Sequence, residues 1–228
     1  MKKVAVIVAG GTGQRMKNTT PKQFIQLVAQ PLLVHTIRSF LTAYHDIQLV
    51  VVLPSSHEMQ GRLILDEYFP DVPIQITTGG ETRFHSVQNG LRFVKEESIV
   101  FVHDGVRCLV SAALIQRCYE TAVTSGSAIP ALVSSDSIRI RTHEGHHPHD
   151  RNEIFLIQTP QTFQSSWILP AFEQDYDPSF TDEATVVETT GRSLTLVEGE
   201  ESNIKITRPV DLLIAAQWLS LRGTSNGQ

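Results

Sequence analysis

Three stretches of the chain are almost continuously apolar. They cover residues 4–8, 47–53 and 98–102, and Pro54 ends the second stretch. A strand that is covered by helices on both faces shows such an unbroken run, whereas a strand with one solvated face alternates apolar and polar residues. We therefore expect these stretches to be buried strands of a mainly parallel sheet.

Helical periodicity appears between and after these strands. Apolar residues three or four positions apart indicate helices with one buried face. The stripes are Leu33, Ile37, Phe40, Leu41 and Tyr44, then Val87, Leu91 and Val94 after a start at Thr82, then Leu114, Ile115, Cys118 and Ala122. Strands that alternate with helices favour a three-layer α/β fold, Rossmann-like, with the sheet between two layers of helices.

The alternation is interrupted between residues 135 and 158. Residues 138–141 alternate apolar and polar side chains, Glu144 and Gly145 begin a histidine-rich turn, and residues 154–157 are apolar. We expect 138–141 and 154–157 to pair as a projecting β-hairpin arm. A two-stranded hairpin buries little by itself, so the arm needs a partner surface.

After the arm, the α/β pattern resumes at Phe163. We expect a helix through Asp175, a second helix from Asp182, a strand at 193–197 and a final helix from Arg208. Neither a linker nor an internal repeat separates these parts. Residues 1–228 are therefore expected to form one domain, with 135–158 as its arm.

Charge and composition exclude several classes of function. The net charge is −5 and the isoelectric point is about 6.0, so there is no basic footprint for nucleic acid. No apolar run approaches the ~18–20 residues of a membrane span, and the run after Lys2 and Lys3 is too short for a signal-peptide core. Cys108 and Cys118 suit a reducing compartment, so we expect a cytoplasmic protein without a membrane partner.

A glycine-rich loop follows the first expected strand, and Lys22 comes soon after it. The loop reads Ala9-Gly10-Gly11-Thr12-Gly13-Gln14-Arg15-Met16. Its glycines allow a tight turn that brings backbone N–H groups close to an anion, and the two cations suit a polyphosphate. The third glycine of a dinucleotide fingerprint and the Gly-Lys-Ser/Thr end of a P-loop are both missing. An ordinary turn without a ligand remains the alternative.

Two further polar clusters lie at the ends of strands, and we expect the first of these strands to end at Gly79. Gly79-Gly80-Glu81-Thr82-Arg83 opens a helix whose free N–H groups favour a polar or anionic ligand, although an ordinary turn explains it as well. In His103-Asp104-Gly105-Val106-Arg107, the aspartate suits a hydroxyl or a magnesium ion and the arginine suits a phosphate, unless the two form a simple salt bridge. Ligands of parallel sheets bind beyond the carboxyl ends of the strands, where these clusters lie.

Three features nearer the C-terminus have a simple structural or incidental explanation. Thr181 with Asp182 is typical of a helix N-cap. Lys205 stands between two isoleucines, as either a solvated lysine or one directed at a ligand, and Pro209 suits a first helical position. The histidine run suits adventitious metal binding better than a preorganised site, and it comprises His143, His146, His147 and His149.

Taken in order, these motifs resemble the family of 2-C-methyl-D-erythritol 4-phosphate cytidylyltransferases of non-mevalonate isoprenoid synthesis. The resemblance covers almost the whole chain. It is carried by the glycine loop, Pro21-Lys22-Gln23, Gly79-Gly80, His103 to Arg107, Asp150-Arg151-Asn152, Gln158-Thr159-Pro160-Gln161, Thr181-Asp182-Glu183-Ala184, Val197-Glu198-Gly199 and Asn203 to Pro209. It implies the fold of the nucleotide-diphospho-sugar transferases, and transfer of a cytidylyl group from CTP to a polyol phosphate with Mg²⁺ as cofactor.

The resemblance also implies roles for individual residues. Arg15 and Lys22 fall on transition-state-stabilising cations, and Arg151 and Lys205 on residues that position the sugar phosphate. Nucleotide contacts fall on Ala9, Gly10, Gly11, Thr12, Gly13, Gly80, Ser86 and Asp104. Substrate contacts fall on Arg107, Ser137, Thr159 and Thr181. Asp104 also falls near the Mg²⁺ ion, which the CTP phosphates would mainly hold.

The family is a homodimer whose arm enters the partner's site, so the resemblance implies that Ser137 and Arg151 act in trans. The chain departs from the family at two places. Asp136-Ser137 replaces an Asp-Thr pair and keeps the hydroxyl. Gly105-Val106-Arg107-Cys108 replaces Ala-Ala-Arg-Pro, and Cys108 frees a backbone N–H, which is expected to loosen the loop.

The residue types suit this chemistry. A phosphomonoester has a second pKa of about 6, so it is mostly dianionic at pH 7 and attacks without a general base. Nothing in the chain offers a serine or cysteine nucleophile beside a base. Arg15, Lys22 and Lys205, together with Mg²⁺, would offset the repulsion between this dianion and the triphosphate.

Three alternatives stay open at the level of sequence. The nearest is a ribitol-5-phosphate cytidylyltransferase, which shares the glycine loop and Pro21-Lys22-Gln23. The second is a sugar-phosphate nucleotidyltransferase of the same fold that uses another nucleotide. The third is a nucleotide-binding regulator without activity, against which the intact cations speak.

Overall fold

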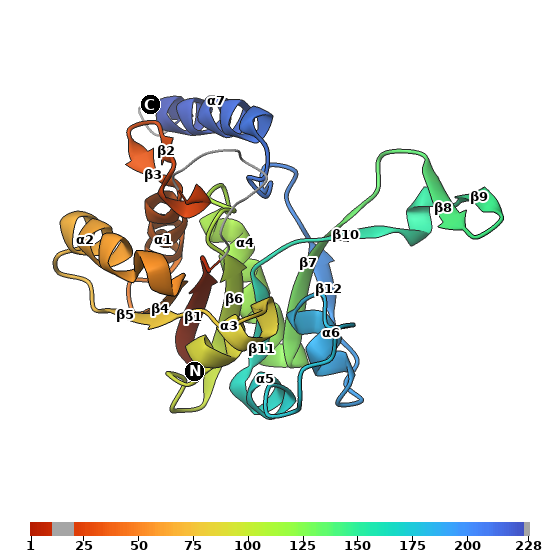
Figure 1. Cartoon of the computed structure of the whole chain (residues 1–228), viewed down its shortest axis with the longest axis horizontal. Helices are drawn as coiled ribbons and strands as arrows, with labels where there is room; N and C mark the ends of the chain where they lie inside the picture. The colour runs from red at the N-terminus through yellow and green to blue at the C-terminus, as the bar shows by residue number, and fades with distance from the viewer. Residues whose placement is uncertain (11–20, 226–228) are drawn as a thin grey trace.

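A mixed, mainly parallel sheet forms the centre of the molecule (Figure 1). The structure is a computed structural model that describes residues 1–10 and 21–225, with side chains described as far as residue 221. In this part of the chain the main sheet has eight strands, in the order β10-β7-β11-β6-β1-β4-β5, with β12 beside β7. Their bounds are β1 (Lys2–Val8), β4 (Gln48–Leu53), β5 (Ile74–Thr78), β6 (Ser98–Asp104), β7 (Ser127–Val133), β10 (Phe155–Ile157), β11 (Gln161–Gln164) and β12 (Leu196–Glu198).

Helices cover both faces of this sheet. One face carries α1 (Leu32–Ala43), α2 (Glu58–Tyr68) and α4 (Ala112–Ser125), and the other carries α3 (Arg83–Leu91), α5 (Ser165–Ala171) and α6 (Glu183–Glu188). Strand β1 divides between the two cores, because Ala5 and Ile7 join the first and Val4 and Val6 join the second. Successive side chains of a strand point to opposite faces, so an unbroken apolar run is buried on both sides. The predicted three-layer α/β fold is confirmed.

The last helix, α7 (Pro209–Ser225), begins at Pro209, the first helical position that the sequence predicts. Its Leu212, Ala216 and Leu219 pack on a small cluster that includes Cys108 and Ile206. No helix in the described part of the chain is both long and apolar enough to cross a membrane. The remaining short elements are β2 (Gln26–Leu27), β3 (Gln30–Pro31) and the 3-10 helices η2 (Lys22–Phe24), η3 (Ser55–His57) and η4 (Arg151–Glu153).

The arm contains only the first of the two strands that were predicted for it. Strand β8 (Ile138–Thr142) pairs with β9 (Gly145–His149), and Figure 1 shows this hairpin standing away from the body. The predicted pairing with 154–157 is wrong, because β10 joins the main sheet antiparallel to β7. The histidine run, expected as a turn, mostly forms β9. Glycine, histidine and proline do not favour strands, and Pro148 is tolerated because it lies in a two-stranded hairpin.

Several other boundaries differ from the sequence-based expectation. The helix expected to reach Asp175 ends at Ala171, because Phe172 turns into the core and stacks on Phe84 with ring centroids 4.8 Å apart. The strand expected at 193–197 is β12, which begins at Leu196. The sequence analysis did not predict α2 or β7. In α2 only Gly61 and Leu65 are buried, which leaves no clear apolar stripe.

Candidate active site

A cavity of about 480 Å³ opens where β1 and β6 end and α3 begins. Ligands of parallel sheets bind at such strand ends, and the volume is within the usual range for small-molecule sites. Seven of the predicted site residues line it: Ala9, Gly10, Lys22, Gly80, Ser86, Asp104 and Lys205. Four others, Gly11, Thr12, Gly13 and Arg15, lie outside the described residues.

Small residues allow the backbone segments around the cavity to approach one another. A Cβ added at Gly80 would lie 2.4 Å from the Cβ of His85, and one added at Gly105 would lie 2.9 Å from that of Ala9. The Ser86 hydroxyl accepts a hydrogen bond from the Gly80 N–H at 3.1 Å and donates to the Thr82 carbonyl at 2.9 Å. Ser86 therefore fixes the turn that leads from β5 into α3.

Asp104 is the buried anion of this site, with a side chain that is 6% exposed. Among the described residues, three cations contact its carboxylate. Arg83 Nη1 lies 2.6 Å from Oδ1, while Arg107 Nε and Lys205 Nζ lie 3.2 and 3.0 Å from Oδ2. Burial alone would raise the pKa of Asp104, but Arg83, Lys205 and Arg107 outweigh it and hold that pKa well below its usual range. The carboxylate is therefore ionised at neutral pH.

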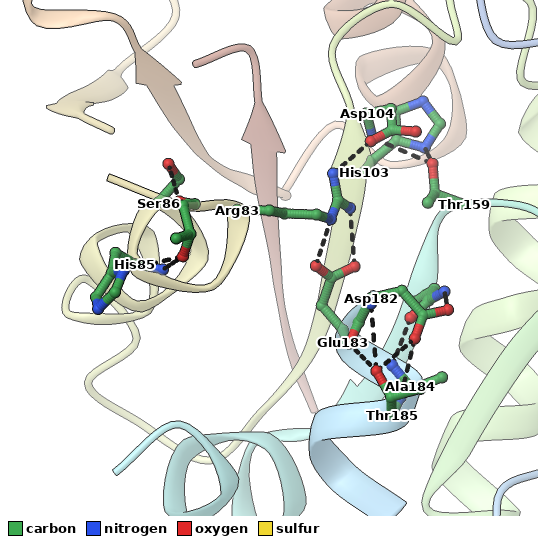
Figure 2. A network of polar contacts seen from close by, with 12 residues as sticks. Arg83, His85, Ser86, His103, Asp104, Thr159, Asp182, Glu183, Ala184 and Thr185 are labelled. Atoms are coloured by element: carbon green, nitrogen blue, oxygen red, sulfur yellow. Dashed lines mark hydrogen bonds and ion pairs between the residues drawn. The ribbon is translucent and has the colours of Figure 1, made fainter. Parts of the chain in front are cut away.

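A neutral histidine supports Asp104 from behind (Figure 2). The Asp104 N–H donates to Thr159 Oγ1 at 3.1 Å, and this hydroxyl lies 3.0 Å from His103 Nδ1. His103 Nε2 lies 3.1 Å from the Arg107 carbonyl, so Nε2 carries the proton and Nδ1 accepts from Thr159. Burial lowers the pKa of His103 to about 4. Thr159, an expected substrate contact, thus lies behind Asp104 and does not line the cavity.

The sequence analysis missed the partner that connects Asp104 to the rest of the fold. Arg83 donates from Nε and Nη2 to the two carboxylate oxygens of Glu183, each at 2.9 Å (Figure 2). Each residue directly follows a helix N-cap: Thr82 caps α3, and Asp182 caps α6 through a capping box. In the sequence, the available signal is that a charged residue directly follows each cap. This signal gives no reason to pair Arg83 with Glu183.

The remaining predicted substrate contacts lie elsewhere. Arg107 is mostly buried behind Asp104, where its Nη1 also donates to the Asn203 carbonyl at 2.8 Å. Thr181 is exposed and precedes the cap of α6. Ser137 and Arg151 lie at the base of the arm, with Arg151 Nη1 donating to the Ser135 carbonyl at 2.9 Å. None of these four residues lines the cavity of its own chain.

The loop that follows Asp104 is held at several points. The Arg107 N–H donates to the Asp104 carbonyl at 3.0 Å, and the Ile206 N–H donates to the Val106 carbonyl at 3.1 Å. Thr36 donates to the Gly105 carbonyl at 3.1 Å, and Cys108 is buried in the cluster under α7. The loosening expected from Cys108 is not seen in this loop. The burial of Cys108 and the hydrogen bonds of the neighbouring residues hold the loop in place of a proline ring.

The wall of the cavity does not fit a protein-bound Mg²⁺ ion. Both oxygens of Asp104 already contact cations, and a divalent ion there would face three positive side chains. In the part of the chain that the structure describes, no group of three or more His, Cys, Asp or Glu side chains could hold a metal. Glu81 is the other carboxylate in the wall.

The fold and the cation-lined cavity at its strand ends define an α/β nucleotidyltransferase. The family model for 2-C-methyl-D-erythritol 4-phosphate cytidylyltransferase, IspD, matches residues 3–220. A relative of that name from Phocaeicola vulgatus is 42% identical over 215 residues, which cover 94% of this chain and 98% of the relative. This chain belongs to the IspD family.

Solved structures agree with this assignment. The 4-diphosphocytidyl-2C-methyl-D-erythritol synthase of Anaerococcus prevotii superimposes with a TM-score of 0.81 at 27% identity, over 96% of this chain and 99% of the other. The 2-C-methyl-D-erythritol 4-phosphate cytidylyltransferase of Francisella tularensis gives 0.79 at 30% identity, with the same coverage of both chains.

Proposed function

We propose that this chain transfers a cytidylyl group from CTP to the phosphate of 2-C-methyl-D-erythritol 4-phosphate and releases pyrophosphate. The observation that carries the proposal is one cavity lined by Lys22, Lys205 and the buried carboxylate of Asp104, together with Gly10 and Gly80. Glycine backbones and cations suit a triphosphate, and an ionised carboxylate suits the ribose hydroxyls. Membership of the IspD family supports the same reaction.

In the proposed reaction, an oxygen of the substrate phosphate attacks the α-phosphorus of CTP. A new P–O bond forms, the bond from the α-phosphorus to the bridging oxygen breaks, and pyrophosphate leaves with that electron pair. The attacking phosphate is already anionic at pH 7, so no side chain needs to remove a proton. Lys22 and Lys205 would stabilise the negative charge that accumulates around the α-phosphorus.

We propose that Mg²⁺ accompanies CTP rather than occupying a site made by the protein. Triphosphate oxygens are the hard ligands that Mg²⁺ prefers, and the ion commonly keeps several waters. The cations that already contact Asp104 support this proposal, because they neutralise the carboxylate that Mg²⁺ would otherwise use. The ion would supply charge neutralisation on the phosphates.

We also propose that the arm completes the site of a second copy in a homodimer. Figure 1 shows the β8–β9 hairpin away from the body, and Arg151 and Ser137 lie at its base. Strand β10, which continues from the arm, exposes three consecutive apolar side chains, Phe155, Leu156 and Ile157, by 47, 52 and 38%. An exposed apolar edge strand favours pairing with another chain, which supports the dimer.

A cytoplasmic location is proposed as well. Cys108 and Cys118 are both buried, and burial raises the pKa of the Cys118 thiol to about 12, so it stays protonated. Buried thiols suit a reducing compartment. Fractionation of the source cells, with activity followed in each fraction, tests this point.

A pyrophosphate-release assay tests the activity. CTP, UTP, GTP and ATP are each offered with 2-C-methyl-D-erythritol 4-phosphate, ribitol 5-phosphate and erythritol 4-phosphate. We expect turnover with CTP and the methylerythritol phosphate to exceed every other pair by at least about tenfold in kcat/KM. Equal or faster turnover with ribitol 5-phosphate would assign the chain to that substrate instead. No pyrophosphate from any pair would leave a nucleotide-binding protein without this activity.

A further inference from the structure

We propose that Arg83, held by Glu183, is a positioning residue for the transfer reaction, which orients the Asp104 carboxylate and through it the amine of Lys205. Neither Arg83 nor Glu183 is among the residues to which the family resemblance assigns a role. The inference rests on the proposed function for the reaction it serves, while the geometry that supports it is independent of any substrate.

The guanidinium of Arg83 is held from two sides. Its Nε and Nη2 bind the two oxygens of Glu183, and its Nη1 binds Asp104 Oδ1 at 2.6 Å (Figure 2). A planar guanidinium with a bidentate partner has one orientation, so its remaining nitrogen points in one direction. A lysine at this position would carry the same charge on a compact ammonium group, which could not make this set of hydrogen bonds to both carboxylates.

The anchor is itself rigid. The side chain of Glu183 is 2% exposed and lies at the start of α6, next to Ala184, whose N–H donates to Gln161 Oε1 at 2.7 Å. Asp182 caps the same helix and accepts from Gln161 Nε2 at 2.8 Å. Glu183 is therefore tied through α6 to strand β11 of the central sheet.

Fixing one oxygen of Asp104 also places the other. With Oδ1 on Arg83, Oδ2 is directed at Arg107 and at Lys205, whose side chain is 44% exposed in the cavity wall. Lys205 is the most exposed of the three cations on Asp104, so its position depends most on this carboxylate. Loss of Arg83 would free the carboxylate to turn toward Arg107 and Lys205.

The placement of Arg83 is not explained by helix stability. It occupies the first position of α3, where the helix dipole disfavours a cation. Glu183 and Asp104 together compensate for this, and they raise the pKa of Arg83 above its ordinary value although burial opposes them. An unfavourable local position kept by two buried carboxylates is consistent with a role in the site.

The test separates positioning from simple ion pairing. Arg83→Met leaves the buried Glu183 without its partner, and Glu183→Leu removes one of the two carboxylates that Arg83 contacts, so each should lower the melting temperature. The double variant removes both charges of the pair and should recover it. We expect the double variant to melt within a few degrees of the parent, yet to bind CTP about tenfold more weakly by calorimetry and to lose about 30-fold or more in kcat/KM. The exposed pair of α2 gives a matched control, so Arg62→Met with Glu58→Leu should change none of these values.

Parental CTP affinity and kcat/KM in a folded double variant would overturn the proposal and leave a purely structural ion pair. If the double variant does not fold, Arg83→Lys provides the same test. This variant keeps the positive charge but loses the forked guanidinium, so we expect the same loss of CTP affinity. Parental CTP affinity in Arg83→Lys would refute the inference. Absence of turnover in the parental chain would count against the proposed function alone, because calorimetry would still measure how the substitutions change CTP binding.

Discussion

Lys205 Nζ lies 3.0 Å from Asp104 Oδ2, and this ion pair lies in the wall of the cavity. Asp104 ends strand β6, whereas Lys205 precedes the last helix, so the tertiary fold alone brings the two together. The pair keeps a cation in the cavity wall. In the proposed reaction, an incoming phosphate would compete with Asp104 for that cation, while Arg83 and Arg107 would still contact Asp104.

Replacing Lys205 tests this competition. Lys205→Ala should raise the KM for the polyol phosphate and lower kcat, with a combined loss of about 10²–10³ in kcat/KM, since a cation near transferring phosphoryl groups is removed. Steady-state kinetics with each substrate varied in turn measures both constants. Lys95, which is exposed and does not line the cavity, supplies the matched control Lys95→Ala. An unchanged KM and kcat in Lys205→Ala would remove this residue from the mechanism.

Lys22 is expected to act mainly in the transition state. Lys22→Ala should lower kcat and kcat/KM together by about 10²–10³ while CTP affinity changes little, because charge at the α-phosphorus grows only as the reaction proceeds. Calorimetry with CTP and turnover measurements on the same preparation separate the two effects. A near-normal kcat with only a raised KM would assign Lys22 to ground-state binding instead.

Arg151 should act on the partner's site. Arg151→Ala is expected to raise the KM for the polyol phosphate and leave CTP binding nearly unchanged. If the arm works in trans, mixing Arg151→Ala with Lys22→Ala should restore activity, because a heterodimer then contains one site with both residues intact. Subunit exchange is verified with differently tagged chains. Exchange without recovery would place Arg151 in the site of its own chain.

The stability of the protein should fall in weak acid because of His103. Its pKa is about 4 in the fold and about 6.5 when unfolded, so between these values the unfolded chain binds the proton more readily. The contribution of neutral His103 is complete above pH 6.5 and is lost as the pH falls toward 4, with a slope of at most about 1.4 kcal/mol per pH unit.

Urea unfolding at a series of pH values measures this slope. His103→Gln should be less stable than the parent at pH 7, because packing and hydrogen bonds are lost, but should show a shallower decline between pH 6.5 and 4. The exposed His45 provides the control His45→Gln, whose curve should follow the parent. An identical slope in His103→Gln would contradict the assignment.

The histidine run should be dispensable for turnover. Its four side chains lie in or beside the exposed hairpin strand β9, and replacing His143, His146, His147 and His149 with serine should leave Mg²⁺-dependent turnover within about threefold of the parent. The run still offers imidazoles for adventitious nickel or zinc. A large loss of activity in a variant that stays folded and dimeric would show that the arm depends on these side chains.

The class of fold and the place of the site follow from local sequence. Unbroken apolar runs such as the one in β1 can only be buried on both faces, which requires helices on both sides of the sheet. Gly10, Gly80 and Asp104 lie at or within two residues of strand ends, and parallel strands end along the same edge, so they share one cavity. The order of short motifs was sufficient to indicate the family.

Tertiary structure alone decided the pairing of distant groups. Residues 154–157 are as apolar as an arm strand would be, and only the free edge of β7 determines that they join the main sheet. Arg83 and Glu183 are ordinary charged residues at helix starts in the sequence, and they become partners because α3 and α6 cover the same face. Local patterns specify which residues are buried, but long-range hydrogen bonds and ion pairs depend on which elements pack side by side.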